Sequence, residues 1–265
     1  MSTIEPPNPY APPRAELDVP APTPAAMPAN LEGAMAGRYD FTIGEVMDEA
    51  WQHVKGMKAT FWGAGIVFLL INVAINRISG HILGMLAAKP HLVVQMFFRS
   101  VVGALTAPVT IGMTMMCVRR ALGAPISFKT AFSYYGKSLP VIGCALVMVV
   151  LSWTGLLIFV LPGLYFWIAY SFALPLVCDQ GLSPWQALET SRRAATHKWF
   201  TLLGLTLLVG VLTCVSALGL LIPLIWTLPW SMMTTAVAYR RIFYGAMPGA
   251  PVAAPSLPLP PGALR

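Results

Sequence analysis

Long apolar runs alternate with short polar and basic segments along the chain. The runs that we predict to be membrane-spanning helices are residues 59–76, 100–118, 139–160, 164–178, 199–221 and 222–239. A helix needs about 20 residues to cross the hydrocarbon core, and most of these runs approach that length. Because backbone inside a bilayer must satisfy its own hydrogen bonds, each span is expected to be helical. The pattern predicts an all-α, polytopic membrane helix bundle with about six transmembrane helices.

Two of the breaks between predicted spans are very short. Only Leu161, Pro162 and Gly163 separate the third span from the fourth, and the fifth meets the sixth near Pro223. One continuous helix of about 40 residues would be about 60 Å long, twice the hydrocarbon thickness. We expect the chain to turn at Pro162 and Gly163, since proline lacks a donor and glycine tolerates a reversed backbone. The spans then form three hairpins, of which the one at Pro162 is either fully spanning or re-entrant.

Each predicted hairpin follows a segment that carries a helix-start signal together with aromatic and basic residues. Thr42 with Glu45, and Ser183 with Gln186, have the capping-box spacing, and a weaker copy begins at Ser127. Amphipathic helices of this composition lie at the headgroup boundary. We therefore predict an interfacial helix before each hairpin. The candidate lipid-headgroup contacts are Trp51, Tyr134, Tyr135, Trp185, Arg192, Arg193 and Lys198.

Composition excludes a soluble protein and sets the domain limits. The chain is 57% hydrophobic and only 10% charged, with a mean hydropathy of +0.69, whereas soluble domains have about 25% charged residues. Residues 1–40 and 246–265 are rich in proline and are expected to be disordered cytoplasmic tails, either solvated tethers or docking peptides. The integral membrane helical domain is residues 41–245.

Basic residues are distributed unevenly between the two sides of the predicted bundle. Of the 17 Lys and Arg residues, only Arg77, Lys89 and Arg99 fall on the side opposite the termini. By the positive-inside rule, both termini are cytoplasmic, in a multi-pass protein of the bacterial inner membrane. The net charge of +7 comes from basic residues that flank the spans and do not form a separate nucleic-acid-binding domain. We therefore expect these residues to bind anionic phospholipids and not nucleic acid.

Chemically reactive groups are scarce within the predicted spans. All acidic residues lie outside them, and the four histidines have no metal-ligand spacing, so no metal, cofactor or catalytic site is predicted. The four cysteines lie in apolar runs and are expected to be buried thiols. We expect the chain not to be an enzyme.

Polar residues within the spans form two stripes at helical spacing. The candidate intramembrane polar seam consists of Asn72, Asn76, Thr106, Thr110 and Thr114. Such a seam either guides a headgroup or solute between helices, or supplies the hydrogen bonds that hold ordinary bundles together. Prolines in three spans are expected to kink their helices. They are Pro108, Pro175 and Pro229.

The segment LPGLYFWIAYSFALPLVCDQGLSPWQALETSRR carries a further pattern. Its characteristic positions are Pro162, Gly163, Tyr170, Ser171, Pro175, Asp179, Gly181, Ser183, Ala187, Leu188 and Ser191. The segment resembles the bacterial multi-pass membrane-domain superfamily that includes the glycerophosphodiester phosphodiesterase membrane domain and the YciC-like inner-membrane proteins. The resemblance implies a multi-helix inner-membrane domain, in which any phosphodiesterase activity belongs to a separate soluble domain. It transfers no catalytic residue, and Asp179, Ser183 and Ser191 are interpreted as turn and cap residues.

These patterns lead to two functional hypotheses. The first is a non-enzymatic membrane protein that organises or senses envelope lipids through its basic, aromatic interfacial helices. The alternative is a permease or lipid-translocating protein that uses the polar seam.

Overall fold

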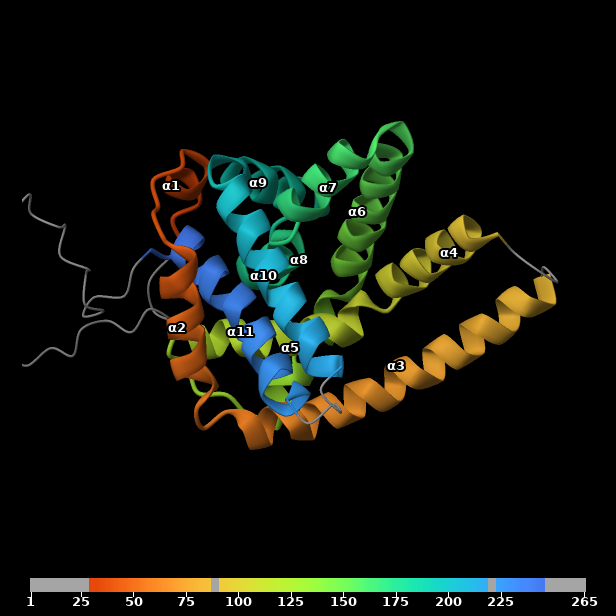
Figure 1. The fold of residues 1–265 in the computed structure, drawn as a ribbon, viewed down its shortest axis with the longest axis horizontal. Helices are drawn as coiled ribbons and strands as arrows, with labels where there is room; N and C mark the ends of the chain where they lie inside the picture. Colours follow the sequence, from red (N-terminus) through yellow and green to blue (C-terminus); the bar gives the residue numbers. More distant parts are fainter. Residues whose placement is uncertain (1–28, 87–90, 219–222, 246–265) are drawn as a thin grey trace, which may run out of the picture.

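The computed structural model describes residues 29–86, 91–218 and 223–245, and it is all-helical over them (Figure 1). The elements are α1 (Leu31–Met35), α2 (Ile43–Val54), α3 (Lys58–Leu86), α4 (Leu92–Leu105), α5 (Ala107–Ala121), η2 (Phe128–Phe132), η3 (Tyr135–Lys137), α6 (Ser138–Ile158), α7 (Val160–Ala169), α8 (Ala173–Gln180), α9 (Pro184–His197), α10 (Trp199–Leu218) and α11 (Leu224–Phe243). The predicted all-α class is confirmed. Within the described ranges, 4 helical segments are long and apolar enough to cross a membrane, or up to 5 if the bent pair α4 and α5 forms one span.

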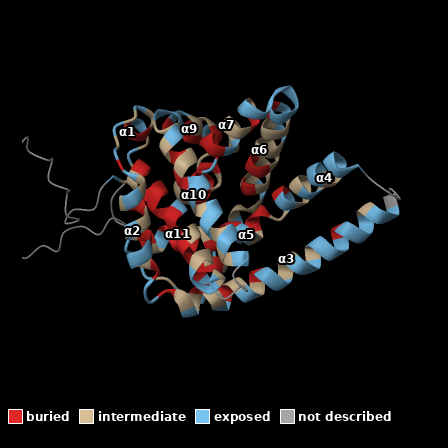
Figure 2. Cartoon of the chain, viewed as in Figure 1, coloured by how far each residue is buried: buried red, intermediate tan, exposed pale blue. Residues whose placement is uncertain are grey.

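The core is built around α11, which packs against α2, α5 and α10. Most of its last three turns are buried, including Met233, Val237, Tyr239 and Phe243. Figure 2 shows that buried residues concentrate on α11 and its neighbours, while α3 and α4 are largely exposed along their length. In Figure 1, α3 and α4 extend away from the core. Helix α4 packs against α6, where the Phe97 and Trp153 rings meet edge to face at 5.6 Å.

The turn between the third and fourth predicted spans lies before the proline and glycine expected to form it. Helix α6 ends at Ile158, Phe159 is extended, and α7 begins at Val160. Pro162 therefore occupies the first turn of α7, where a missing N–H donor costs nothing. Gly163 instead permits close packing, because a Cβ there would lie 2.9 Å from the Cα of Leu156 on α6. The dipeptide sets how closely α7 folds back on α6.

The first predicted hairpin differs from expectation in both of its helices. Helix α3 continues ten residues past the predicted end at residue 76, and it carries Arg77 and His81 on its exposed surface. The second predicted span is broken at Thr106 into α4 and α5, which are bent by 65°. Pro108 lies in the first turn of α5, so the predicted kink at this proline is confirmed. Residues 77–86 and 92–99, which lie between the first two predicted spans, are thus helical.

The two strongest helix-start predictions are confirmed. Thr42 Oγ1 accepts a hydrogen bond from the Glu45 amide at 3.3 Å, and Ser183 Oγ accepts one from the Gln186 amide at 3.5 Å. Both boxes are completed by the reciprocal side-chain bond. The copy at Ser127 forms only the short 3-10 helices η2 and η3. Its aromatic, serine and glycine residues are weak helix formers, which accounts for the difference.

The folded part of the chain begins earlier than residue 41. Residues 31–35, which the sequence places in the N-terminal tail, form α1 and pack against α9 and α11. The Asn30 amide donates to the Phe243 carbonyl at 2.7 Å, which fixes α1 beside the end of α11. The rest of the predicted tails, residues 1–28 and 246–265, lies outside the described residues.

Candidate functional site

Segments that the charge count assigns to one side of the membrane contact one another in the structure. Arg120, at the end of α5, donates to the carbonyls of His53 at 3.4 Å and Lys55 at 3.2 Å after α2. Lys198, after α9, pairs with Asp40, which lies before α2. The Lys198 ammonium lowers the pKa of Asp40. The larger cause is the hydrogen bond that it donates to the carboxylate, and the second is its positive charge. The end of α5 and the residue after α9 thus bind at the two ends of α2, and we call this side of the molecule, along α2, the polar end.

A four-residue ion-pair cluster joins α2 to α11 at this polar end. Arg241 donates to Glu49 at 2.9 Å and to Glu45 at 2.7 Å, and Arg240 also pairs with Glu49. The side chain of Arg240 is 2% exposed, and its Nε and Nη1 atoms have no hydrogen-bond partner among the described residues. His53 lies 3.6 Å from Glu49. Burial lowers the pKa of His53, and the charges of Arg240 and Arg120 act in the same direction against the attraction of Glu49.

The apolar face of α2 that sequence analysis assigned to the membrane surface packs instead against protein. Val46, Ala50 and Val54 are buried, and α2 contacts α11, α5 and α10. Trp230 of α11 donates its indole N–H to the Met47 carbonyl at 3.2 Å. The same amphipathic periodicity therefore serves helix packing within the chain.

The predicted headgroup contacts occupy different environments. Trp51, Trp185 and Tyr135 are exposed, whereas Tyr134 is buried and its hydroxyl accepts a hydrogen bond from Arg119 Nε at 2.9 Å. Arg192 and Arg193 both pair with Glu189, at 2.8 Å and 2.6 Å. These hydrogen bonds lower the pKa of Glu189 to about 2. Arg192, Arg193 and Lys198 thus already have carboxylate partners within the chain.

The predicted polar seam is divided. Thr106 caps the junction of α4 and α5 and Thr110 lies beyond the 65° bend, so the threonines do not follow one straight helix face. Thr106 and Thr110 donate to carbonyls of their own chain segment, at 3.0 Å and 3.1 Å. The Asn72 and Asn76 amides do the same, at 2.9 Å and 2.8 Å. Thr114, the last member, is half-buried on α5. These bonds satisfy the polar groups locally, as expected for ordinary bundle side chains.

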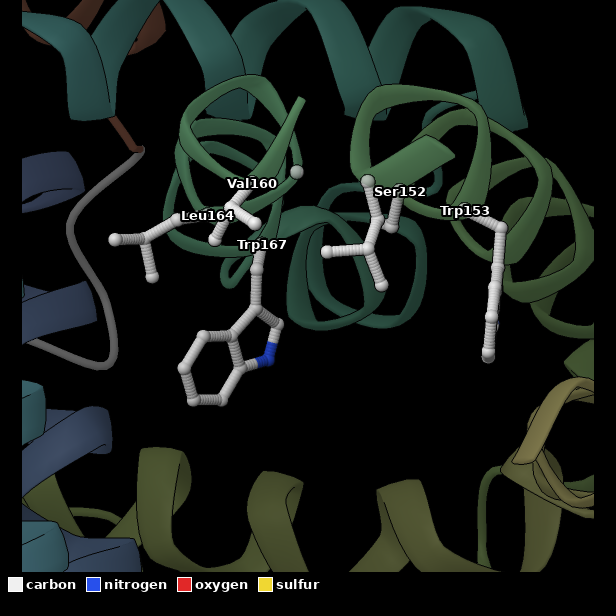
Figure 3. Close-up of a pocket in the computed structure, with 7 residues that line it drawn as sticks. Ser152, Trp153, Val160, Leu164 and Trp167 are labelled. Carbon is white, nitrogen blue, oxygen red and sulfur yellow. The ribbon is translucent and has the colours of Figure 1, made fainter. Parts of the chain in front are cut away.

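A groove lined by two tryptophans lies on α6 and α7 and reaches α4 and α5. Two adjoining cavities of about 340 Å³ and 330 Å³ share Ser152, Trp153 and Trp167, and together we call them the tryptophan groove. Figure 3 shows Trp153 and Trp167 projecting to the same side of α6 and α7. The second cavity extends to α4 and α5, where Ser100 and Thr110 contribute hydroxyls. The groove is otherwise lined by aliphatic side chains, glycine and alanine.

A more polar cavity lies at the polar end of the molecule. It has a volume of about 330 Å³ and is lined by Arg119, Ser133, Tyr134, Lys137, Cys178 and Asp179. We call it the basic pocket. In the sequence, Arg119 and Lys137 are recognisable only as positive charges on the cytoplasmic side of the predicted spans. The sequence does show that Arg119, Lys137 and Asp179 each lie at the end of an apolar segment, which is the feature that could have predicted the pocket.

Asp179 is held by donors from two helices. Its Oδ2 accepts hydrogen bonds from the hydroxyls of Tyr239 at 2.7 Å and Tyr244 at 2.6 Å. It also accepts one from the side-chain Nε2 of Gln180 at 2.8 Å. Burial, followed by the contact with Asp179, raises the pKa of Tyr244. Asp179 therefore connects α8 to the end of α11, a larger role than the turn residue that its sequence context suggested.

Ser191 also differs from its interpretation as a cap residue. It is fully buried in the middle of α9, where its hydroxyl donates to the Ala169 carbonyl at 2.7 Å and accepts from the Phe172 amide at 3.3 Å. These two backbone groups lie at the break between α7 and α8. Ser191 thus supplies hydrogen bonds that the interrupted helix cannot supply itself.

The remaining reactive groups are dispersed. Cys117, Cys144 and Cys178 are buried as predicted, but Cys214 is exposed on the outer surface of α10, contrary to the prediction. Among the residues that the structure describes, no three His, Cys, Asp or Glu side chains form a group that could hold a metal ion.

Comparison with known proteins gives no relative. No family model, no curated protein and no solved structure matches this chain.

Proposed function

We propose that the chain is a non-enzymatic integral membrane protein that binds and organises phospholipids. The observation that carries this proposal is the tryptophan groove, which combines an apolar lining with a few hydroxyls. An acyl chain fits such a lining because it offers dispersion contacts and asks for no hydrogen bonds. Tryptophan is also favoured where an apolar region adjoins the wet boundary of the bilayer.

In the proposed topology, the chain crosses the bacterial inner membrane six times and both termini are in the cytoplasm. The crossings are α3, the bent pair α4 and α5, α6, the pair α7 and α8, α10 and α11. Support for one basic side comes from the contacts between the ends of α2, α5, α9 and α11, which carry eight of the 17 Lys and Arg residues. One contact opposes the hairpin layout, because Lys58 Nζ at the start of α3 lies 5.3 Å from the Trp226 ring at the start of α11, which six full crossings would place on the opposite side. The resemblance of residues 161–193 to bacterial inner-membrane domains favours the same topology.

The topology is tested in a Cys214→Ser background, because Cys214 is exposed near the end of α10, with an aqueous thiol reagent that does not cross the bilayer. Phe159→Cys, at the tip between α6 and α7, is expected to react in intact cells. Arg193→Cys, on the exposed surface of α9, is expected to react only after the membrane is permeabilised. Reaction of Arg193→Cys in intact cells would overturn the proposed orientation.

Lipid binding is tested by mass spectrometry of the full chain purified in mild detergent. The wild type is expected to retain phospholipid, and a Trp153→Ala, Trp167→Ala variant is expected to lose most of it. Trp226→Ala is the matched control, since Trp226 is a partly exposed tryptophan outside the groove that contacts Lys58. Equal phospholipid recovery from the wild type and the groove variant would refute the proposal.

One observation favours lipid translocation as a second candidate. The hydroxyls of Ser100, Thr110 and Ser152 line the second cavity of the groove, so this path is not wholly apolar. A translocating protein would accelerate exchange of fluorescent phospholipids between the leaflets of reconstituted vesicles. Exchange at the rate of protein-free vesicles would leave binding without translocation.

A further inference from the structure

The basic pocket contains two cations without a carboxylate partner. No carboxylate oxygen of the described residues lies within 4.0 Å of Arg119 or Lys137, although five other Lys and Arg side chains make such pairs. Those five are Arg192, Arg193, Lys198, Arg240 and Arg241. The only acidic side chain that lines the pocket is Asp179, and its Oδ2 already accepts three hydrogen bonds. The pocket therefore has unpaired positive charge.

The donors of the pocket are held in place but not used up. Arg119 lies with its Cζ 5.7 Å from the centre of the Tyr134 ring and donates only from Nε, to the Tyr134 hydroxyl. Lys137 donates one N–H to the Cys178 carbonyl at 2.6 Å. Among the described residues, the terminal nitrogens of Arg119, two N–H groups of Lys137 and the Tyr134 hydroxyl proton have no acceptor. Fixed donors of this kind lose little freedom when an anion binds.

The pocket lies at the level expected for headgroups. Arg119 is in the last turn of α5, Lys137 directly precedes α6, and Asp179 is near the end of α8. Helices α6 and α8 belong to segments that are long and apolar enough to cross a membrane, and α5 does so if the bent pair α4 and α5 forms one span. Since all three residues line one cavity, the three segments end at a common depth there.

We propose that the basic pocket binds the phosphate group of a phosphate ester through Arg119, Lys137 and Tyr134. This inference rests on the proposed function for its setting, because it places the headgroup of a bound phospholipid at the cytoplasmic end of the bundle. Arg presents its donors as a planar fork that matches phosphate oxygens, and Lys adds a point charge. A free phosphate ester from the cytoplasm has the same chemistry. The cavity of about 330 Å³ is in the range of small-molecule sites.

The test is native mass spectrometry of the full chain in mild detergent, titrated with three probes. The probes are a short-chain phosphatidylglycerol, the diacylglycerol with the same chains, and glycerol phosphate. The wild type is expected to bind phosphatidylglycerol more tightly than diacylglycerol. Replacing both cations, as Arg119→Gln with Lys137→Gln, is expected to weaken phosphatidylglycerol binding about 100-fold, since each charge-assisted hydrogen bond is worth about tenfold. Diacylglycerol binding is expected to be unchanged.

Lys129→Gln is the matched control. Lys129 is exposed on η2, near the pocket in sequence but outside its lining, so this variant makes the same charge change without touching the site. It is expected to bind phosphatidylglycerol as the wild type does. If the double variant fails to fold, Lys137→Gln alone is expected to weaken binding about tenfold. Binding within about threefold of the wild type in every folded pocket variant would overturn the inference.

The probes also distinguish the source of the phosphate and the two proposals. Competition by glycerol phosphate that depends on Arg119 and Lys137 identifies a water-soluble ester as a ligand. Cation-dependent binding of phosphatidylglycerol without such competition identifies the lipid headgroup. If phosphatidylglycerol binds no more tightly than diacylglycerol, in the wild type and in the pocket variant alike, the phosphate site is refuted and the proposed lipid binding stands. If the wild type binds glycerol phosphate but neither lipid, the proposed function is refuted and the phosphate site stands.

Discussion

Helices α10 and α11 pack against each other, yet they arrange apolar and polar side chains in opposite ways. Helix α10 is strongly apolar, but only 11% of its most apolar stretch is buried, and Leu207, Val211 and Val215 are exposed. Helix α11 carries Thr234, Tyr239 and Arg240, and all three are buried. It is also not among the helices that are apolar enough to be recognised as spans by themselves.

This contrast is the reverse of what a water-soluble protein requires. In water, an apolar helix is driven into the core, and charged side chains are almost never fully buried unless they are paired. In lipid, exposed leucine and valine cost nothing, while polar groups must find partners inside the protein. Thr234 accordingly donates to the Trp230 carbonyl at 2.8 Å, and Arg240 pairs with Glu49. Apolar runs predicted spans at both helices, but the average hydropathy of α10 is the higher of the two, so hydropathy alone ranks the exposed helix above the central one.

The largest expected effect comes from removing the partner of the buried arginine. Glu49→Ala leaves Arg240 without an ion-pair partner in the core, and unfolding should become easier by about 3–5 kcal/mol. Arg240→Met removes the charge and retains most of the volume, so its cost should be smaller. The measurement is denaturant unfolding in detergent micelles. Equal losses for the two variants would show that α11 does not depend on compensation of the Arg240 charge.

The exposed side of the comparison is tested by adding a charge to α10. Leu207→Arg places a cation near the middle of this helix, where insertion into a membrane should become less favourable by about 2.5–3.5 kcal/mol. Leu207→Met is the control, because it keeps an apolar side chain of similar volume. The yield of correctly inserted protein reports the effect. Normal insertion and stability of the arginine variant would mean that this face of α10 does not contact lipid.

A pair of glycine variants separates packed helices from lipid-facing ones. A Cβ at Gly112 on α5 would lie 1.7 Å from the Ala131 carbonyl oxygen, whereas nothing lies within 4 Å of a Cβ at Gly210 on α10. Gly112→Ala should destabilise by about 1–3 kcal/mol through overpacking. Gly210→Ala should stabilise by up to about 1 kcal/mol through helix propensity. Thermal unfolding of both variants in one detergent gives the comparison, and a shift of the same sign in both would contradict it.

Features that depend on neighbouring residues were predictable from the sequence. Both capping boxes were predicted correctly, because the side chain and the amide that it caps are three residues apart. The bend next to Pro108 was predictable for the same reason. Apolar length alone located α3, α6 and α10, although α3 runs past its predicted end because nothing near Arg77 stops a helix.

Features that depend on contacts distant in sequence were not predictable. Gly163 was assigned to a turn because its role, a close approach to Leu156, appears only once α7 lies on α6. The basic pocket requires Arg119, Lys137 and Asp179 to be brought together from three separate segments. The apolar face of α2 was recognised, but periodicity cannot tell whether such a face contacts lipid or another helix.

The smallest expected effect concerns His53, at the boundary between the buried cluster and solvent. Its folded-state pKa lies below the ordinary value, chiefly because of burial, so the unfolded chain binds the proton more readily. Stability should therefore fall as the pH drops below about 6.5, the ordinary histidine pKa, and level off below the folded-state pKa. The paired carboxylate of Glu189, with a pKa of about 2, titrates well below this window. His53→Gln should flatten the dependence of the unfolding midpoint on pH between about 5 and 8, and His197→Gln, on the exposed end of α9, should retain it. If the unfolding midpoint of His53→Gln still depends on pH as in the wild type, other groups cause the dependence, and the contact between α2 and α11 is not responsible for it.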